Sequence, residues 1–383
     1  MVTFSMPPEH SGAAKQAITL ASKLAENGIS IFFVTQGSSK ASLNSRKVGE
    51  FRVIRVYKET LFWKALAPAR FFWTFFRERK KYSLLHVHGV GYLGKVAVIF
   101  GKLFGKKVIL KMTMFTEDDA MSIKNGRFGG LDFFLFSLAS HYITITDSFY
   151  RSCVVAGIPQ SKISQIPNGV NTDRFRPLSV VEKQDTRRKF GLPLDKTILV
   201  YAGLIRPEKG IDFLLDTLEL IAKSRHDIML LLMGPVETWM PAAERDYALR
   251  QIQRMEGAGL KELVHFAGNV DNVHEYLQVA DIFVSASRRE GLPNVLLEAM
   301  ATALPPIVIN IPNVHDSILQ DHVDGIVVMK RDVETFATEI QNLVDNEALR
   351  RSLSAAALSK INSKYAVKKI TTDYLKLYDR LMA

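Results

Sequence analysis

Apolar and polar positions alternate with two different periods at the start of the chain. Residues 1–6 and 29–35 are short apolar runs that predict buried strands, and residues 13–27 between them carry an apolar stripe at helical spacing. Gly28 follows this stripe, as is typical after the last turn of a helix. Strand, helix and strand predict a parallel β–α–β unit, in which ligands bind beyond the carboxyl ends of the strands. We therefore expect the loop at Gly12 to face a ligand.

The same alternation continues along the chain and predicts the fold class. Apolar runs predict further strands at 83–88, 108–113, 141–146, 197–201, 228–234, 264–267, 281–284 and 306–309. Amphipathic stretches predict helices at 148–156, 211–224, 242–257, 273–279, 294–303 and 366–381. Strands that alternate with helices in two successive series predict an α/β protein of two doubly wound domains.

Residues 61–81 differ from the other helical stretches because aromatic side chains are mixed with lysine and arginine. Pro68 is expected to split or kink a helix here. An amphipathic, basic and aromatic segment suits the surface of an anionic membrane. It suits equally a helix that packs its aromatic rings inward, and the sequence leaves both interpretations open.

The stretch from Ser285 to Ala303 carries the most specific chemistry. Gly291 supplies a tight turn after a strand, and Pro293 suits the first turn of the following helix. Seven residues separate Glu290, in the loop, from Glu298, on the helix. The start of a helix attracts phosphate, and a carboxylate can accept hydrogen bonds from two neighbouring hydroxyls of a sugar or ribose. These features together indicate a nucleotide-sugar site.

A second loop, at 202–210, offers positive charge. Arg206 and Lys209 lie there between a predicted strand and a predicted helix, and Gly203 and Gly210 give the backbone freedom. Two cations can hold a diphosphate and stabilise it as a leaving group without a metal ion. We therefore predict that this loop binds the diphosphate of the same ligand.

Polar residues also follow strands in the first half of the chain. His88 ends a predicted strand, where it is placed to meet a substrate, whereas His86 is expected to be structural. We expect the two rings to face opposite sides of the strand; with no third ligand apparent, they are not predicted to bind a metal. The acidic residues of the next loop could bind hydroxyls of an acceptor, be solvated, or, with weaker support, bind a metal ion: Glu117, Asp118 and Asp119.

Composition and charge narrow the class of protein. The chain has 383 residues, enough for two or three domains, and its single cysteine, Cys153, fits a reducing cytoplasm. No apolar run reaches the length of a membrane span, and no signal peptide is visible. Residues 1–176 carry a net charge of +14 and the remainder −3, which sum to +11. The basic half suggests an anionic partner, but no RNA-binding or zinc pattern supports a nucleic acid.

Two segments resemble a known family. Glu290 and Glu298, with Gly-Leu-Pro-Asn between them, resemble the glutamate-x7-glutamate motif of the family-four retaining glycosyltransferases, and residues 168–175 are similar to that family's asparagine-glycine-valine segment. The resemblance implies a GT-B fold, with two Rossmann-like domains facing across a cleft and a C-terminal helix that crosses back to the first. The expected divisions are an acceptor-binding domain at 1–176, a nucleotide-sugar-binding domain at 177–363 and the returning helix at 364–383.

The same resemblance implies roles for individual residues. The catalytic group would comprise Glu290, His88, Arg206 and Lys209. The donor would be bound by Gly12, Arg206, Lys209, Asn269, Val270, Glu290, Gly291, Leu292, Asn294 and Glu298. The acceptor would be bound by His88, Glu117, Asp118 and Asp119. The family often has an arginine directly after the glycine at 203, where this chain has Leu204.

These implications define an expected function. A sugar would pass with retention from a UDP- or GDP-linked donor to a saccharide or lipid-linked saccharide acceptor, with no metal or other cofactor. The enzyme would be cytoplasmic, with segment 61–81 available to an anionic membrane surface, and would bind no nucleic acid. Two alternatives stay open: a nucleotide-sugar epimerase of the same architecture, and a catalytically silent subunit of a glycosylation complex.

Overall fold

The protein forms two compact units. The computed structural model describes residues 1–7, 11–37, 46–57, 61–236, 240–257, 259–312 and 314–383. Unit 1 combines Met1–Gly169 with Val367–Ala383, and unit 2 is Val170–Ala366. The sequence placed the divisions after residues 176 and 363, whereas the structure divides after Gly169 and Ala366.

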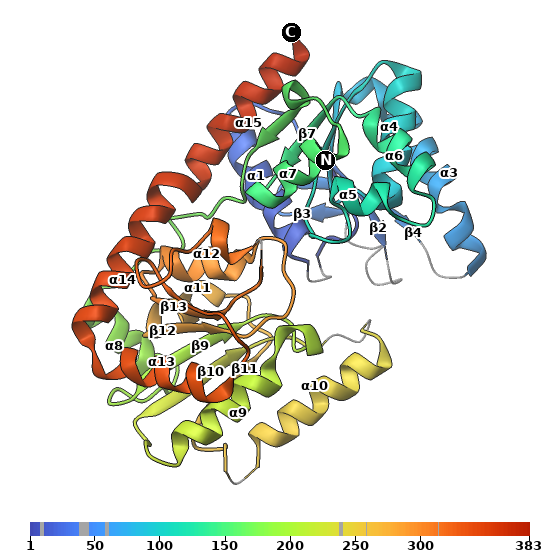
Figure 1. Ribbon diagram of the computed structural model, residues 1–383. Helices are drawn as coiled ribbons and strands as arrows, with labels where there is room; N and C mark the ends of the chain where they lie inside the picture. The colour runs from blue at the N-terminus through green and yellow to red at the C-terminus, as the bar shows by residue number, and fades with distance from the viewer. Residues whose placement is uncertain (8–10, 38–45, 58–60, 237–239, 258, 313) are drawn as a thin grey trace. The chain divides into compact units, whose positions relative to one another are not determined.

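Unit 1 is built on an eight-stranded sheet within the described residues (Figure 1). The strand order is β3-β4-β2-β1-β5-β6-β7-β8, and every neighbouring pair is parallel except β3 with β4. The strands are β1 Val2–Thr3, β2 Phe33–Gly37, β3 Lys47–Val48, β4 Phe51–Tyr57, β5 Leu84–His88, β6 Lys107–Lys111, β7 His141–Thr144 and β8 Ile163–Gln165. The helices are α1 Gly12–Glu26, α3 Leu61–Glu78, α4 Gly91–Phe104, α5 Ala120–Lys124, α6 Gly129–Ser137, α7 Asp147–Ala156 and α15 Val367–Met382.

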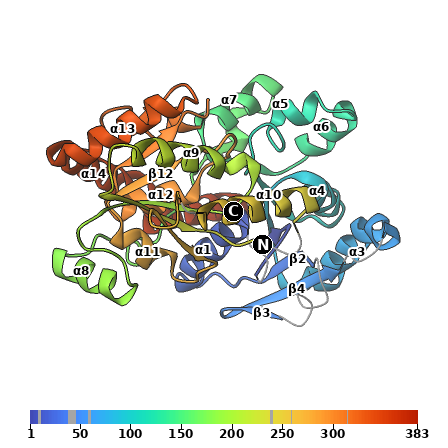
Figure 2. The ribbon, with the colours of Figure 1, turned by 90° about the horizontal axis from the view of Figure 1, so that it is seen from below.

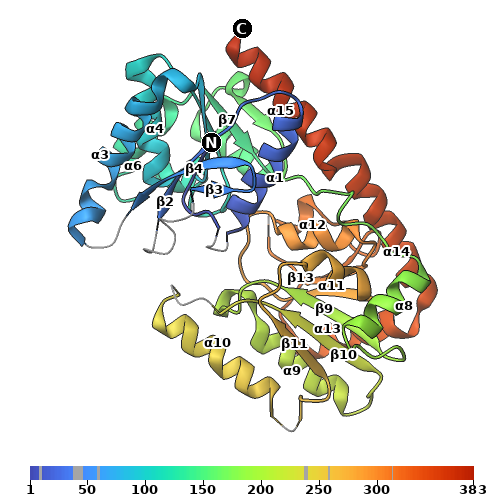
Figure 3. The same ribbon diagram turned by 180° about the vertical axis from the view of Figure 1, so that it is seen from behind.

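The last helix, α15, completes the core of unit 1, as the sequence predicted for a returning C-terminal helix. Its apolar stripe, Ile370, Tyr374, Leu377 and Tyr378, packs with Leu20 and Leu24 of α1 and with Ile109 and Ile143 of the sheet. Figure 3 shows α15 lying along α1, on the side of unit 1 away from α3, α4 and α6. The hydrophobic core of unit 1 therefore depends on α15, which follows all of unit 2 in the sequence.

Unit 2 is built on a fully parallel six-stranded sheet of order β11-β10-β9-β12-β13-β14. The strands are β9 Thr197–Ala202, β10 Ile228–Met233, β11 Val264–Gly268, β12 Ile282–Ser285, β13 Pro306–Ile309 and β14 Ile326–Val328. The helices are α8 Val180–Lys189, α9 Ile211–Ala222, α10 Ala242–Met255, α11 Val273–Val279, α12 Asn294–Ala301, α13 Val333–Asp345 and α14 Glu347–Lys360. Figure 2 shows α9 and α13 on one side of this sheet and α11 on the other. Both faces are therefore covered, which is why its strands read as continuous apolar runs.

The direction of strand order reverses once in each sheet. In unit 1 the reversal lies between β1 and β5, and in unit 2 between β9 and β12. Loops leaving the carboxyl ends of two such strands diverge to opposite faces of the sheet, and the space between them is where ligands bind in doubly wound folds. The fold therefore points to four loops, one after each of these strands.

Most predicted strands and helices are confirmed within a few residues. The helix α3 runs through Pro68 without a break, so of the expected split or kink the split is wrong. The elements that were not predicted are β3, β4, β8, α4, α5, α6, α8 and the whole region from β14 to α14. Helix α6 was not predicted because nearly all of its residues are apolar, so the sequence shows no helical periodicity there.

Candidate functional site

The reversal in unit 2 brings together the two loops that the sequence singled out. The strands β9 and β12 are parallel neighbours, with Ile282 beside Leu199 and Phe283 beside Val200. The loop after β9 carries Arg206 and Lys209, and the loop after β12 carries Glu290. Both loops leave the carboxyl edge of the sheet, which is where a ligand of this fold is expected.

An ion pair joins the two loops. The ammonium of Lys209 lies 2.5 Å from Glu290 Oε1, and both side chains are largely buried. The two residues are 81 positions apart in the sequence. A short, partly buried ion pair between two loops fixes their relative position more firmly than a surface pair does. Lys209 and Glu290 are thus held at the point predicted to bind the sugar and diphosphate.

Helix α12 presents the second glutamate. It begins at Asn294, as predicted, with Pro293 at its N-cap, whose side chain makes no cap hydrogen bond. Glu298 lies one turn after Asn294, and its side chain is buried, with 4% exposure. Gly291 and Leu292 are also buried, so the turn before the helix is closely packed. The contacts of Glu298 with a ribose and of the helix start with a phosphate stay predictions.

Carboxylates surround Arg206 in the loop after β9. Its guanidinium lies 2.6 Å from Glu244 Oε2 of α10 and 3.0 Å from Glu208 Oε1. A planar guanidinium paired in this way is positioned and neutralised by protein groups. In this structure Arg206 therefore anchors the loop on α10, and its predicted contact with a diphosphate stays a prediction.

Arg331 is a site residue that the sequence analysis missed. It follows β14, and its guanidinium donates a hydrogen bond of 2.5 Å to the carbonyl oxygen of Ala286 in the loop after β12. It also lies 4.5 Å from the ring centre of Phe213. A Cβ atom on Gly210 would approach Arg331 to 2.7 Å. The available signal was its place directly after a carboxyl strand end, on the same edge as Lys209.

Gly210 has to be glycine for two reasons. Its φ is +68°, in the left-handed region that side chains disfavour. A Cβ atom there would also lie 2.2 Å from the carbonyl oxygen of Ala286. The loops after β9 and β12 therefore touch through the backbone as well as through Lys209 and Glu290.

The remaining donor residues of unit 2 lie further along the same edge. Asn269 and Val270 directly follow β11, with β10 standing between that strand and β9. Asn269 is exposed and Val270 is partly buried. Like Lys209, they lie beyond the carboxyl ends of the strands.

The unit 1 reversal positions Gly12 and His88. Gly12 is the first residue of α1, after the N-cap Ser11, whose hydroxyl accepts a hydrogen bond from the N–H of Ala14. His88 ends β5 and is buried, with both ring nitrogens lacking a hydrogen-bond partner among the described residues. Burial lowers the pKa of His88 well below its usual value, so the ring is neutral.

The expectation that His86 and His88 face opposite ways is wrong. Their rings stack, with centroids 4.3 Å apart. Residues two apart in a strand point to the same face, and Val87 between them points to the other. His86 Nδ1 lies 2.7 Å from the hydroxyl of Tyr378 on α15, which supports its predicted structural role.

Two of the three acidic residues predicted to bind acceptor have structural roles. Asp118 accepts hydrogen bonds from the N–H groups of Thr113 and Met114, and Asp119 caps α5. Both carboxylates are buried and engaged by their own loop, which argues against contact with acceptor hydroxyls. Glu117 alone of the three is exposed.

Two sequence profiles of known families match this chain. The profile described as glycosyl transferases group 1 matches residues 182–360, and the profile described as glycosyltransferase family 4 matches residues 10–174. The chain belongs to the group 1 glycosyltransferases. The two matches fall on unit 2 and unit 1 respectively and together span nearly the whole chain.

Individual relatives agree with this assignment. This glycosyltransferase is 29% identical over 277 residues to EpsD of Bacillus subtilis, a match that covers 71% of this chain and 70% of EpsD. It is 24% identical over 302 residues to the UDP-Gal:alpha-D-GlcNAc-diphosphoundecaprenol alpha-1,3-galactosyltransferase of Escherichia coli, covering 76% of this chain and 74% of that protein. Among solved structures, HepE of Anabaena, in complex with UDP and glucose, superposes with a TM-score of 0.77 at 16% identity, covering 99% and 98% of the two chains.

These comparisons confirm the predicted family and fold. The protein is a transferase of sugar units with the GT-B fold, in the synthesis of polysaccharides or glycoconjugates. The roles of individual residues, the absence of a cofactor and the retention of configuration stay predictions. No group of three or more potential metal ligands is found in the described part of the chain. No helix among the described residues is long and apolar enough to cross a membrane.

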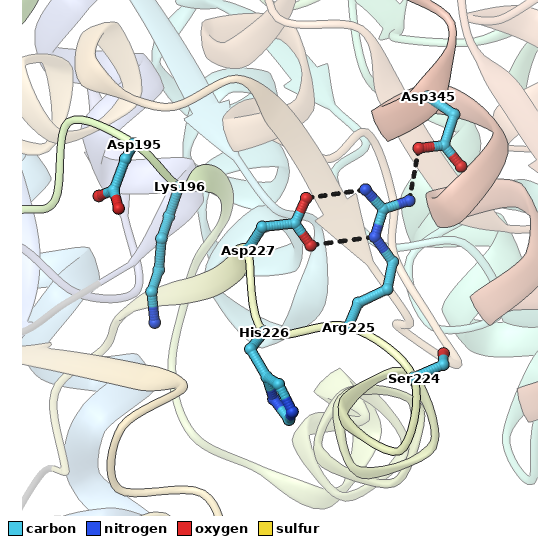
Figure 4. Close-up of a pocket in the computed structure, with 7 residues that line it drawn as sticks. All are labelled: Asp195, Lys196, Ser224, Arg225, His226, Asp227 and Asp345. Atoms are coloured by element: carbon cyan, nitrogen blue, oxygen red, sulfur yellow. Dashed lines mark hydrogen bonds and ion pairs between the residues drawn. The ribbon is translucent and has the colours of Figure 1, made fainter.

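A cavity of about 650 Å³ lies at the opposite edge of the unit 2 sheet (Figure 4). Lys196 lies just before β9 and Asp227 just before β10, so this cavity is at the amino ends of the strands. Arg225 in its wall is bound by Asp227 at 2.8 Å and Asp345 at 2.5 Å. Because it lies at the amino ends of the strands, whereas Lys209 and Glu290 lie beyond the carboxyl ends, we do not assign the donor to this cavity.

Proposed function

We propose that this glycosyltransferase moves a sugar from a UDP- or GDP-linked donor, with retention of anomeric configuration, to a saccharide or lipid-linked saccharide acceptor. The observation that carries the donor assignment is the ion pair between Lys209 and Glu290 at the carboxyl edge of β9 and β12, beside buried Glu298. In this proposal Glu298 accepts hydrogen bonds from the ribose, and Glu290 with the backbone of Gly291 and Leu292 holds the sugar. Lys209 and the start of α12 face the diphosphate.

Charge at the donor site supports a step that accompanies binding. Arg206 and Lys209 carry two positive charges, against three carboxylates in contact with them: Glu208, Glu244 and Glu290. A diphosphate brought to this edge meets no free excess of positive charge in this group. We infer that the Lys209 ammonium leaves Glu290 for the diphosphate, which frees the Glu290 carboxylate for sugar hydroxyls. The movement of Lys209 would thus allow both its own contact with the diphosphate and the contact of Glu290 with the sugar.

Retention would follow from attack on the face that the diphosphate leaves. A double displacement needs a carboxylate placed as a nucleophile against the anomeric carbon. In this proposal Glu290 binds sugar hydroxyls and Glu298, on α12, binds the ribose, so neither carboxylate is assigned as that nucleophile. The departing diphosphate would then take the proton of the acceptor hydroxyl. The neutral ring of His88 would contact substrate from unit 1, and exposed Glu117 would contact the acceptor.

The acceptor proposal rests on a relative's name and on the charge of unit 1. The Escherichia coli relative is named for a diphosphoundecaprenol-linked acceptor. Residues 1–176 of this chain carry a net charge of +14. A diphosphate-linked lipid acceptor is anionic and lies in a membrane, so a basic unit suits it. The enzyme would then work at the cytoplasmic surface of that membrane.

A thermal-shift comparison tests the donor proposal. We expect UDP or GDP, and one of the corresponding nucleotide sugars, to raise the melting temperature of the native protein. Glu298→Gln should weaken this stabilisation at least about tenfold in ligand concentration, because one lost hydrogen bond from a charged group costs roughly 1.5–3 kcal/mol. The matched control is Glu262→Gln, an exposed glutamate just before β11 at the amino edge of the sheet. Equal stabilisation of the Glu298→Gln variant and the native protein would remove Glu298 from the donor site.

A further inference from the structure

Helices α3, α4 and α6 present large apolar side chains to solvent on one side of unit 1. Figures 1 and 3 both show the three helices side by side, away from α15. Six of these side chains are Trp73 on α3, Leu103 and Phe104 at the end of α4, Phe128 at the N-cap of α6, and Leu131 and Phe134 on α6; Leu66 and Ile99, on α3 and α4, are 38% exposed as well. Large exposed apolar groups gathered on one side of a protein mark an interaction surface. We call these six residues the outer apolar face.

Ring contacts make the α3 and α4 part of this face continuous. Trp73 stacks on Phe76 at 5.6 Å, and Phe76 contacts Phe104 at 5.4 Å. Phe104 in turn stacks on buried Phe100 at 4.5 Å, so the exposed rings are backed by the core. The outer apolar face is therefore held rigid from beneath.

Helix α6 extends the face and is unusual for a surface helix. Its nine residues are all apolar or glycine except Asp132 and Ser137. Asp132 is bound to Lys95 of α4 at 2.5 Å, which ties α6 to its neighbour. A helix that is apolar all round is normally buried in protein or lipid, yet Leu131 and Phe134 are 64% and 58% exposed. Something outside the chain is needed to cover it.

Basic side chains accompany the outer apolar face. Residues 61–107 contain ten Lys or Arg and one acidic residue, Glu78. Arg52 and Lys81 hold Glu78 at 2.9 Å, and the hydrogen bond from Arg52 is the main cause that lowers the pKa of Glu78 to about 2. Because Asp132 is also paired, both acidic residues of α3, α4 and α6 are neutralised. The exposed bases beside the apolar groups are Arg70, Arg77, Lys102 and Arg127.

We propose that the outer apolar face docks unit 1 on an anionic lipid bilayer. Apolar and aromatic groups would enter the interface, while the flanking arginine and lysine side chains reach the phosphates of the lipid headgroups. This deepens the proposed function, on which it rests, because it names the surface that brings the enzyme to a lipid-linked acceptor. A protein that bound this apolar centre and its surrounding net positive charge would have to be apolar and equally acidic, whereas a bilayer of acidic phospholipids supplies both features.

The structure also changes which residues of segment 61–81 take part. Phe71 and Phe75 of α3 are buried in unit 1, at 0% and 1% exposure, so much of the aromatic segment packs inward. Trp73 points outward and joins α4 and α6. Of the two interpretations that the sequence left open, each describes one side of the same helix. The side that faces lipid is completed by two helices that the sequence analysis did not predict.

Vesicle sedimentation of the intact protein tests the proposal. The probes are vesicles of phosphatidylcholine alone and vesicles that also contain phosphatidylglycerol. We expect binding to the anionic vesicles, weakened by salt, and at least tenfold weaker binding of the triple variant Trp73→Ser, Leu131→Ser, Phe134→Ser. The control is Val180→Ser, Val181→Ser on α8 of unit 2, two side chains that are 73% and 68% exposed. This control should bind the vesicles as the native protein does.

A spectroscopic and an assembly measurement make the outcome specific. The tryptophan emission of the native protein should shift to the blue on anionic vesicles, and Trp73→Phe should lose this shift while still sedimenting with them. If the native protein ignores both kinds of vesicle, or if the triple variant binds as well as the control, the proposal is overturned. Conversion of a native dimer into a monomer by the triple variant, with no effect on vesicle binding, would assign the face to a second copy instead. Stabilisation by UDP or GDP in the same variants is independent of lipid, so failure here leaves the donor site standing.

Discussion

At the scale of single residues, Lys111 is the group whose environment is least expected. It ends β6 beside His88, with 2% exposure, and its nearest described aromatic contact is the ring of Tyr374 at 5.6 Å. Burial lowers the pKa of Lys111 to about 7. Within the described residues it forms no ion pair. A lysine in this position destabilises the folded state whenever it is charged.

The stability of unit 1 should therefore depend on pH through Lys111. The unfolded lysine has its ordinary pKa near 10.5, so the folded state is penalised fully below pH 7, and the penalty disappears as pH rises from 7 to 10.5. Lys111→Met should stabilise the protein on the order of 4 kcal/mol at pH 6.5, with little gain left near pH 10. Chemical unfolding across this range measures the difference. Exposed Lys107→Met, at the start of the same strand and on the same face, should show no such pH dependence, and parallel curves for the two variants would contradict the expectation.

Residue pairs distant in sequence explain most of what the sequence could not predict at the site. Glu290, Glu298 and Lys209 were identified from motif and spacing, and they lie at the carboxyl edge where the fold requires a ligand. The capture of Arg206 by Glu244 could not be foreseen, because it depends on how α10 packs, 38 residues further along. The engagement of Asp118 has a local cause instead, because the turn before it brings the N–H groups of Thr113 and Met114 to its carboxylate. By contrast, the orientation of His86 and His88 was available from the two-residue period of a strand.

At the scale of elements, the loops after β9 and β12 act as one assembly. Lys209 and Glu290 join them by charge, Arg288 N–H donates to the carbonyl oxygen of Glu208 at 2.7 Å, and Gly210 lies against Ala286. Because Gly210 has no side chain, the loops after β9 and β12 can lie in contact, which brings both strand ends toward a common ligand. The helix α15 was predictable from its periodicity because one face of it is buried, whereas α12, which is buried on most sides, was predictable from its motif and from Pro293. The element α6 was not, because its exposed side is as apolar as its buried side.

Replacing Gly210 should separate backbone strain from loop contact. Gly210→Ala should cost roughly 3 kcal/mol of stability or more and reduce stabilisation by UDP or GDP, because both the left-handed φ and the Ala286 carbonyl oppose a Cβ atom. Gly191→Ala is the matched control: its φ is +66°, and nothing lies within 4 Å of the added atom. That variant should lose only about 1 kcal/mol and keep full nucleotide binding. Chemical unfolding and the thermal-shift assay measure the two effects, and equal losses would show that contact between the loops is unimportant.

At the scale of the whole molecule, each unit has its own hydrophobic core, and α15 belongs to the core of unit 1. The unit 1 core includes Leu377 of α15, at 3% exposure, whereas the unit 2 core contains no residue of that helix among those described. Damage to α15 should therefore spread through unit 1 and spare the proposed donor site of unit 2. The division follows the two family profiles, each of which matches one unit.

Leu377→Ala tests this separation. Truncation of a buried leucine should destabilise unit 1 by roughly 2–5 kcal/mol. Hydrogen exchange resolved by peptide should then accelerate in β5, β6 and α1, with exchange in β9 and β12 and nucleotide binding unchanged. Met382→Ala, at a side chain 48% exposed near the end of the same helix, should leave both units as they are. Faster exchange in both units of the Leu377→Ala variant would mean that they unfold together.

The return of α15 to unit 1 has a consequence for synthesis on the ribosome. All of Val170–Ala366 is translated between the two parts of unit 1. Unit 2 can therefore complete its fold while unit 1 still lacks the helix that seals Ile109 and Ile143. Until α15 is translated, the apolar surface of the N-terminal sheet around Ile109 and Ile143 stays exposed. We expect chaperones to bind the nascent chain mainly at this stage of translation.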